Sequence, residues 1–292
     1  MAEDFDYFKD TGIIKNRSMD EQAEHVRKFY SHALPMTLRQ RQLWGAGIER
    51  KREKAENIIF FGCYRLARFP QMFRRYFDLL DHMGIDYTFL DKEYCCGAPL
   101  VAPGKGPPLP NANDSPKPGA EREKAEQISR EFMGKNIALA KKAGGRNMVW
   151  GCVWCTYIAR NLCPDTDVSH LYLPDILLSG LNKLNLKTKP TVIGFYQGCH
   201  GRSRRFGPAK LNLQGYRDTL EKIKGLKVVD LPHQLCCQHA ALRIIEEAEK
   251  LNINTIVSPC GGCHDKLINE GKGRIQARFY IDFVCDVVGI PL

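Results

Sequence analysis

The chain has 292 residues, 43% of them hydrophobic, and a formal net charge of +10, which suits one large globular unit or two smaller ones. No stretch approaches ~18 consecutive apolar residues, and the start MAEDFDYFKD lacks the basic segment and apolar run of a secretory signal. These features argue against a transmembrane segment and against secretion, so we expect a cytoplasmic protein. The positive charge fits nucleic acid, an acidic partner protein or an anionic substrate and does not separate them.

Residues 1–56 contain no cysteine and predict an N-terminal helical extension. Ser18 and Glu21 have the spacing of a capping box, in which the two side chains satisfy backbone N–H groups at a helix start. Basic residues gather between positions 39 and 54, with glutamates among them. This stretch favours a solvated helix face, and a docking arm for a partner subunit is the alternative.

Two apolar runs further along the chain end in the same way. Residues 58–61 lead into Gly62-Cys63, and residues 191–196 lead into Gly198-Cys199, which indicates an internal repeat of buried parallel strands. After each run the sequence predicts a helix, a second strand, a Cys-Cys pair, another helix, a third strand and a Cys-x-x-Cys motif. The second and third strands are expected at 87–90 and 147–150 in the first half, and at 227–231 and 255–257 in the second.

This order predicts an α/β fold with two pseudo-repeated domains, each a small, mostly parallel sheet with flanking helices. We expect the first domain at 57–185 and the second at 186–292. A proline-rich stretch at 101–120 is expected to form a loop inserted in the first domain.

Cysteine is unusually frequent, with 12 copies. Cytosolic reductants keep thiols reduced, and a chain of this length folds without disulfides, so metal ligation or redox chemistry is predicted. Ten of the cysteines form two sets of five in the same order. The sets are Cys63, Cys95, Cys96, Cys152 and Cys155, and Cys199, Cys236, Cys237, Cys260 and Cys263.

If the strands are parallel, each set converges at the carboxyl ends of adjacent strands. Four thiolates suffice for a tetrahedral zinc ion or a cubane cluster, so a fifth indicates a larger iron–sulfur assembly or a releasable ligand. The two sets differ, because 55 residues separate Cys96 from Cys152 and only 22 separate Cys237 from Cys260. Zinc therefore remains an alternative to a cluster in the second set. Cys163 and Cys285 fall outside the repeat and are expected to be small buried hydrophobic residues.

Polar side chains also follow the cysteines of the second set. The histidines are His200, His239 and His264, and the arginines are Arg202, Arg204 and Arg205. A histidine can supply the proton that accompanies disulfide reduction or can ligate zinc, and His239 is the first choice because it follows the vicinal pair. The arginines suit an anionic thiol substrate or an acidic carrier protein, with a solvated loop as the alternative.

The segments Gly62-Cys63, Cys95-Cys96-Gly97 and Gly151-Cys152-x-x-Cys155, together with the second set, resemble the duplicated cysteine-rich (CCG) domains of the B-type subunit of heterodisulfide reductase and its relatives. The resemblance spans about residues 57–292. It implies a noncubane [4Fe-4S] cluster in each set, with Cys96 and Cys237 at the reacting centres. It also implies electrons from an iron–sulfur (C-type) and a flavin (A-type) partner subunit, and zinc in one domain of some relatives.

The second set departs from this pattern at Gln238 and His239, which replace the usual glycine-rich continuation. The first cluster is therefore the firmer expectation, and a second cluster or zinc is expected in the second domain. The N-terminal extension and the proline-rich stretch differ from the reductase subunit of methanogens. They resemble more closely the sulfur-oxidation branch of the family, or another non-methanogenic branch.

The expected function is that of an iron–sulfur subunit in a heterodisulfide-reductase-like complex, catalysing thiol–disulfide or other sulfur redox chemistry. The alternative is a non-catalytic electron relay in a larger dehydrogenase complex, with one cluster and one zinc or vacant site. A zinc-stabilised nucleic-acid-binding protein is favoured only by the charge, and we expect no nucleic-acid partner.

Overall fold

A computed structural model describes residues 18–30, 43, 45–101, 119–164, 166–201, 210–232 and 235–291. The chain forms two compact units, one of Met1–Phe77 with Gly84–Leu173 and one of Asp78–Met83 with Pro174–Leu292. Most of the predicted proline-rich loop and all three predicted substrate-binding arginines lie outside the described residues. Within these ranges, no helix combines the length and the apolar character needed to cross a membrane.

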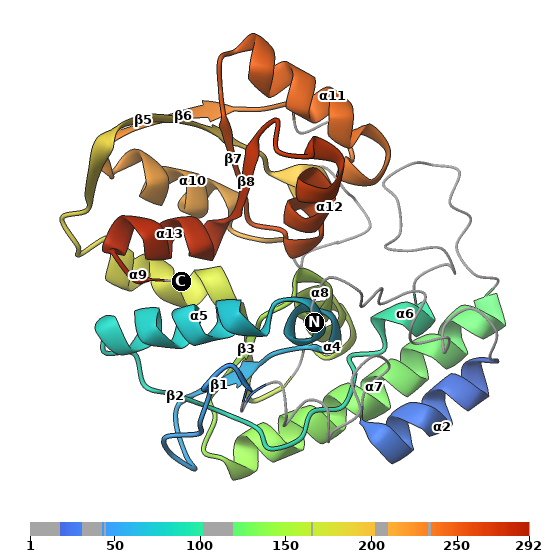
Figure 1. The fold of residues 1–292 in the computed structure, drawn as a ribbon. Coiled ribbons are helices and arrows are strands. Elements are labelled where there is room, and N and C mark those ends of the chain that lie inside the picture. The colour runs from blue at the N-terminus through green and yellow to red at the C-terminus, as the bar shows by residue number, and fades with distance from the viewer. Residues whose placement is uncertain are drawn as a thin grey trace. The chain divides into compact units, whose positions relative to one another are not determined.

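The first unit is built on a parallel four-stranded sheet in the order β2-β1-β3-β4 (Figure 1). Its strands are β1 Asn57–Phe60, β2 Tyr87–Phe89, β3 Asn147–Trp150 and β4 Ser169–Tyr172. The central strands β1 and β3 are almost wholly buried, as continuous apolar runs predict for parallel sheets. Because β1 lies between β2 and β3, the loops after these three strands meet at one edge of the sheet.

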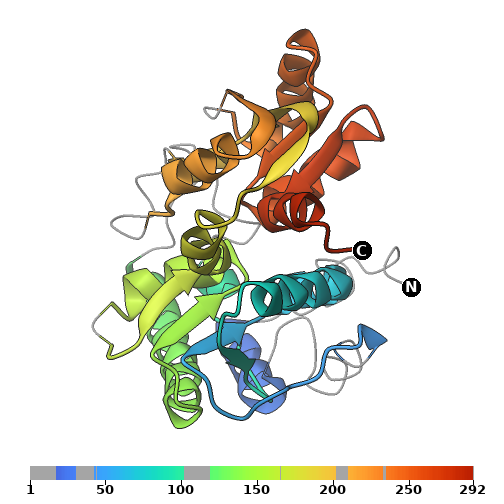
Figure 2. The same cartoon turned by 90° about the vertical axis from the view of Figure 1, so that its left-hand side faces the viewer.

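Helices surround this sheet on both faces (Figure 2). They are α2 Met19–Phe29, α4 Cys63–Arg68, α5 Pro70–His82, α6 Ala98–Val101, α7 Gly119–Lys142 and α8 Val153–Leu162. The capping box at the start of α2 is confirmed: the Ser18 hydroxyl accepts from the Glu21 N–H at 3.3 Å, and the Glu21 carboxylate accepts from the Ser18 N–H at 2.6 Å.

The second unit repeats the topology of the first, with a parallel sheet in the order β6-β5-β7-β8. Its strands are β5 Lys187–Phe195, β6 Lys224–Asp230, β7 Thr255–Ser258 and β8 Gln276–Phe279. Its helices are α9 Leu173–Leu181, α10 Leu213–Glu221, α11 Cys237–Lys250, α12 Gly261–Gly271 and α13 Tyr280–Val288, with a 3-10 turn η1 at Gly198–Gly201. The predicted α/β fold with two pseudo-repeated sheets is therefore confirmed, and the predicted domain boundaries stay predictions.

Two features of the chain differ from the sequence-based expectation. The fourth strand of each sheet, β4 and β8, was not predicted, because each is half exposed and carries no continuous apolar run. The prediction of a helix over the basic stretch 39–54 is wrong for residues 48–54, which form no helix. This segment runs along β2 instead, where the Thr88 hydroxyl donates to the Arg52 carbonyl and Arg50 pairs with Asp91 at 3.0 Å.

Two candidate metal centres

The first set of cysteines lies in three loops at the carboxyl ends of adjacent strands. Cys63 begins α4 after β1, the vicinal pair lies between β2 and α6, and the Cys-x-x-Cys motif joins β3 to α8. Strand order brings these loops together, because β1 pairs with both β2 and β3. The convergence predicted from parallel pairing is therefore present in the first unit.

All five sulfur atoms of the first set form one continuous chain of contacts. The Cys155 thiol donates to the sulfur of Cys96 at 3.3 Å. Further sulfur–sulfur hydrogen bonds join Cys63 to Cys95, Cys95 to Cys96, and Cys152 to Cys155. Cys95, Cys96 and Cys155 are each 3% exposed, whereas Cys63 and Cys152 are partly exposed. The centre thus has a buried side and an open side.

The direction of the pKa shift alternates along the four sulfurs of Cys95, Cys96, Cys155 and Cys152. The pKa of Cys96 is lowered, first by the hydrogen bond from Cys155 and then by those from Cys95 and from backbone N–H groups. The thiol of Cys155 likewise lowers the pKa of Cys152. The pKa values of Cys95 and Cys155 are raised by hydrogen bonding with the neighbouring sulfurs and by burial. Several thiolates in one buried pocket repel one another, and a soft metal cation removes that repulsion.

Two glycines allow the turns beside Cys63 and after Cys96, with Gly62 near a sulfur and Gly97 against α7. Gly62 has φ +72°, and a Cβ there would lie 3.4 Å from the Cys155 sulfur. Gly97 has φ +77°, and its Cβ would lie 2.9 Å from the Cβ of Ser129. Both positions combine a left-handed backbone with close packing, which suits glycine alone.

Glu93 and Asn136 hold the loop of the vicinal pair in place, and sequence reasoning missed both. The buried carboxylate of Glu93 accepts the N–H groups of Phe61 and Gly62 at 3.0 and 3.3 Å, tying this loop to the turn before Cys63. The Asn136 side chain forms two hydrogen bonds, both 2.8 Å, with the backbone of Tyr94. Asn136 comes from α7, and no local motif in the sequence indicates its role.

The indole of Trp150 covers the inner side of the first centre. Trp150 is fully buried in one apolar cluster with Cys96 and Cys155. Its ring packs against Phe60 at a centroid distance of 4.6 Å. This side of the centre is therefore closed to water. The soft donors, close-approach glycines and dry inner side together fit an iron–sulfur cluster or zinc.

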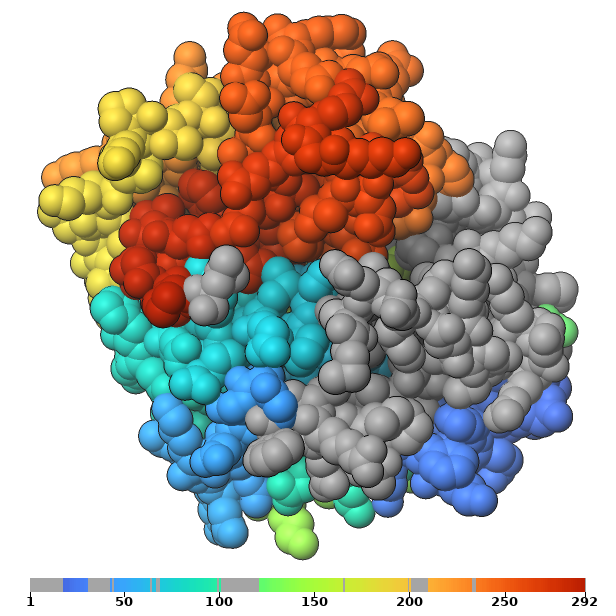
Figure 3. Space-filling view, viewed as in Figure 1, coloured from blue at the N-terminus to red at the C-terminus, as the bar shows by residue number. Residues whose placement is uncertain are grey.

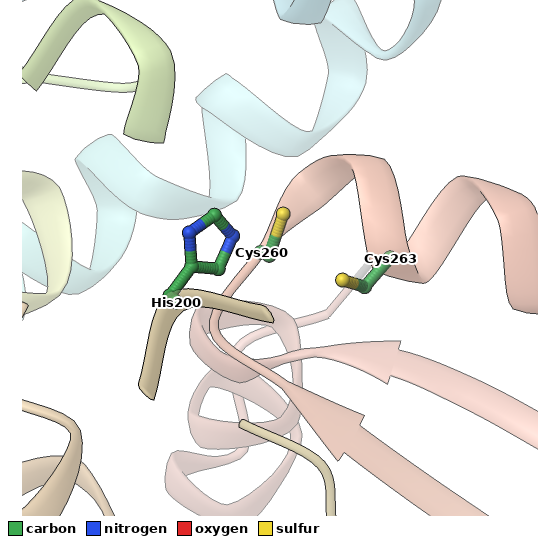
Figure 4. A group of neighbouring side chains, drawn as sticks. All are labelled: His200, Cys260 and Cys263. Carbon is green, nitrogen blue, oxygen red and sulfur yellow. The ribbon is translucent and has the colours of Figure 1, made fainter. Parts of the chain in front are cut away.

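The second set also converges, with a histidine among its sulfurs (Figure 4). The sulfurs of Cys237 and Cys263 are hydrogen-bonded at 3.4 Å. A ring nitrogen of His200 and the sulfurs of Cys260 and Cys263 lie within 4.8 Å of one another, and all three residues are buried. The side chain of Cys199 lies outside the described residues.

Hydrogen bonds also shift the pKa values of this second group. The pKa of Cys260 is lowered, first by the hydrogen bond from Cys263 and also by nearby His200. The pKa of Cys237 is raised mainly by its hydrogen bond to the Cys236 sulfur. Four described thiols and one imidazole form a mixed sulfur and nitrogen donor set, which suits zinc as well as iron.

The other predicted residues of the second unit lie elsewhere. His239 is exposed and lines a groove of about 600 Å³ between α11 and α12, together with Gln238. The Gln238 amide nitrogen lies 4.0 Å from the Cys237 sulfur. His264 is buried on α12. Among the described side chains, His200 from the turn after β5 lies with the thiols of Cys260 and Cys263, and the role of His239 stays a prediction.

The two cysteines outside the repeat differ in their surroundings. Cys285 is fully buried within α13. Cys163 ends α8 and is partly exposed, and burial raises the pKa of its thiol. Neither belongs to a sulfur contact chain that the described residues show.

Two solved structures are similar to this chain at low sequence identity. An aspartate racemase homologue from Pyrococcus horikoshii OT3 is 10% identical, with 80% of this chain and 96% of that chain covered and a TM-score of 0.32. Glutamate racemase from Aquifex pyrophilus is 12% identical, with 78% and 80% covered and a TM-score of 0.31. At these TM-scores neither likeness carries an argument about this chain.

A family model gives the more specific comparison. The model of the CCG cysteine-rich domain matches residues 58–112, a range that contains Cys63, Cys95 and Cys96. The match thus covers three of the five sulfurs that the structure brings together in the first unit. Residues 58–112 therefore resemble a cysteine-rich domain of the CCG type, and the clustered thiols fit metal or iron–sulfur binding.

Proposed function

We propose that this chain is the iron–sulfur subunit of a heterodisulfide-reductase-like complex and that its first cysteine set holds a noncubane [4Fe-4S] cluster. The observation that carries the proposal is the unbroken contact chain of five sulfurs. A cubane cluster or a zinc ion needs only four protein ligands. The fifth sulfur supports a larger assembly or a ligand that leaves when substrate arrives.

The residues that would hold the cluster are Cys63, Cys95, Cys96, Cys152 and Cys155. When bound, such a cluster supplies electrons and an iron atom that can bind a substrate sulfur. Reduction of a disulfide R–S–S–R′ breaks one S–S bond, consumes two electrons and two protons, and yields RSH and R′SH. In the opposite direction two thiols are oxidised and return the same electrons and protons.

The protein surroundings support a substrate approach from one side. Trp150 keeps water from the inner side, and Cys95, Cys96 and Cys155 are buried. Cys63 and Cys152 are the partly exposed thiols of the set. A substrate sulfur would therefore reach the centre beside these two, where protons from solvent are also accessible.

The second set supports an alternative function. Its donors include the imidazole of His200 beside Cys260 and Cys263, and a mixed imidazole and thiolate set is common at zinc. A chain with one cluster and one zinc ion would act as an electron relay in a larger dehydrogenase complex. In the leading proposal the second set holds a further cluster or zinc, and Cys237, His239 and the three arginines after His200 contribute to substrate handling.

Partners and location remain part of the same proposal. The resemblance to the B-type subunit of heterodisulfide reductase supports an iron–sulfur partner of the C-type, a flavin partner of the A-type and a cytoplasmic location. The net charge of +10 supports an anionic thiol, an anionic disulfide or an acidic carrier protein as substrate.

Metal analysis after anaerobic purification tests the cluster. We expect at least about four iron atoms and a matching amount of acid-labile sulfide per chain, and fewer than about three iron atoms would overturn the proposal. Cys96→Ser should lower the iron content and change the low-temperature magnetic resonance spectrum, whereas Cys163→Ser, the control outside the sulfur chain, should leave both unchanged.

A second measurement separates the catalytic role from the relay. Adding a small anionic thiol to the oxidised, iron-loaded protein should change the magnetic resonance spectrum if substrate sulfur reaches the first centre. An unchanged spectrum at saturating thiol, with full iron content, favours the relay.

A further inference from the structure

We propose that α2 and the residue after it, Tyr30, form a wall of the first metal centre and position Cys95 within it. We call Met19–Tyr30 the N-terminal cover. The inference rests on the proposed function only in assuming that the first set is a metal centre. It assigns a role to the helix whose start is predicted by the capping box of Ser18 and Glu21.

The apolar face of α2 belongs to the same apolar cluster as Cys95. Ala23 and Val26 are fully buried, and they share one apolar cluster with Cys95. Cys63 packs against the same cluster, as does Met19 from the first turn of α2. The cover therefore closes a different side of the centre from the buried Trp150 cluster, which contains Cys96 and Cys155 instead.

Two ion pairs hold the cover to α7, alongside which it runs in Figure 1. Arg27 contacts Glu131 at 2.6 Å, and Lys124 contacts Asp20 at 2.6 Å. The hydrogen bonds from Arg27 lower the pKa of Glu131 to about 2. Such partly exposed pairs are weak individually, but they fix the helix at both ends. The outer face of α2 lies at the molecular surface (Figure 3).

Tyr30 connects the cover to the vicinal pair through its backbone. Its carbonyl accepts the N–H of Cys95 at 2.7 Å, and its own N–H donates to the Val26 carbonyl at 2.7 Å. Tyr30 adopts φ +68°, a left-handed conformation that is costly for a residue with a side chain. Its ring packs edge-on against Tyr94 at 4.9 Å, and Lys92 lies 5.3 Å from the ring centroid. These contacts hold the carbonyl against Cys95.

The backbone N–H groups around the vicinal pair have different acceptors. The N–H of Cys95 donates to the Tyr30 carbonyl, whereas backbone N–H groups, including that of Ala98, donate to the Cys96 sulfur. The cover therefore fixes where the backbone of Cys95 lies, through the carbonyl of Tyr30.

Site-resolved alkylation of the reduced, metal-free chain tests the inference. Iodoacetamide labelling is followed at each cysteine by peptide mass spectrometry. In the parent protein we expect Cys63 and Cys152 to react first and Cys95 at least ten times more slowly. Val26→Asp places a carboxylate in the apolar cluster and should accelerate labelling of Cys95 at least tenfold, with labelling of Cys263 in the second unit unchanged.

Phe29→Asp is the matched control, because Phe29 is on the same helix but 38% exposed and outside the cluster. It should leave the Cys95 rate within twofold of the parent rate. Equal Cys95 rates in the Val26 variant and the parent protein would overturn the inference. If the Val26 variant does not fold, Arg27→Glu should raise the Cys95 rate, and adding Glu131→Arg should restore it. Failure of this charge swap to move the rate in either direction also overturns the inference.

The iron-loaded protein provides the readout that links the cover to the centre. Val26→Asp should lose iron to a chelator at least five times faster than Phe29→Asp from the same starting iron content. If the parent chain binds no iron, the proposed function fails, but the labelling contrast in the metal-free chain still tests the cover. The two failures are therefore distinguishable.

Discussion

Gly97→Ala should destabilise the first unit and disturb its metal centre, because no side chain fits at this position. The backbone at Gly97 has φ +77°, which costs a residue with a Cβ about 1–2 kcal/mol. The added Cβ would lie 2.9 Å from the Cβ and 3.1 Å from the Cα of Ser129, and overpacking of this kind costs about 1–3 kcal/mol. The free energy of unfolding should therefore fall by about 2–5 kcal/mol. The displaced loop carries Cys96, so iron content should fall as well.

Urea unfolding of the reduced, metal-free chain measures this loss. Gly84→Ala is the matched control, because Gly84 has φ +64° and nothing within 4 Å of its Cβ position. It should cost only the backbone share, about 1–2 kcal/mol. Adding Ser129→Gly to Gly97→Ala removes the nearest side chain and should recover about 1 kcal/mol or more of the steric share. A Gly97→Ala variant as stable as Gly84→Ala, with full iron content, would refute the steric argument.

Three further predictions concern the surroundings of the two centres. The lowered pKa of Glu131, about 2 against 4.5, means that its pair with Arg27 stabilises the fold above pH 4.5 and is lost as the pH falls from there towards 2. Because both side chains are about one-third exposed, Arg27→Met should lower the free energy of unfolding by about 1 kcal/mol at pH 6. An equal decrease at pH 6 and pH 2.5, measured by urea unfolding, would contradict this. Glu93→Gln replaces one of the two carboxylate oxygens that accept buried backbone N–H groups with an amide nitrogen. The free energy of unfolding should fall by about 1–3 kcal/mol, and an unchanged urea midpoint would count against a role of Glu93 in holding this loop. His200→Ala should weaken zinc binding to the metal-free chain at least tenfold in a chelator competition, while the exposed control His239→Ala should not; equal affinities would remove His200 from the ligand set.

Hydrophobic runs and parallel pairing account for what the sequence analysis predicted correctly. Continuous apolar segments mark the buried strands β1, β3 and β7 and the buried end of β5, and the cysteines that follow them meet because parallel strands share one carboxyl edge. The half-exposed strands β4 and β8 have no such run. Their formation depends on the neighbouring strand that each one pairs with.

The choice between histidines shows why nearness in sequence is a poor guide to a site. His239 is two residues from Cys237, but successive residues of an α-helix are 100° apart around its axis, so the two point to nearly opposite sides. Cys237 is buried and His239 is exposed. His200 reaches Cys260 and Cys263 from another loop, a juxtaposition that only the tertiary fold provides.

Long-range packing also explains why the N-terminal cover could not be predicted. The start of its helix could be predicted from Ser18 and Glu21, because capping is local. Its partners on α7 are 104 residues further along the chain. Amphipathicity indicates that α2 has an apolar face, but sequence alone does not say what covers that face.

The distance in sequence between α2 and its partners on α7 has a kinetic consequence for the first centre. A helix of 11 residues such as α2 is barely stable on its own, so it orders only when α7 is present. Elements held by few contacts are among the first to open in a folded protein, and such openings occur on timescales of microseconds to seconds. If the first set holds a metal, that metal would pass Cys95 during these openings or leave through the open side beside Cys63 and Cys152. Its residence time would therefore depend in part on a helix that contributes no ligand.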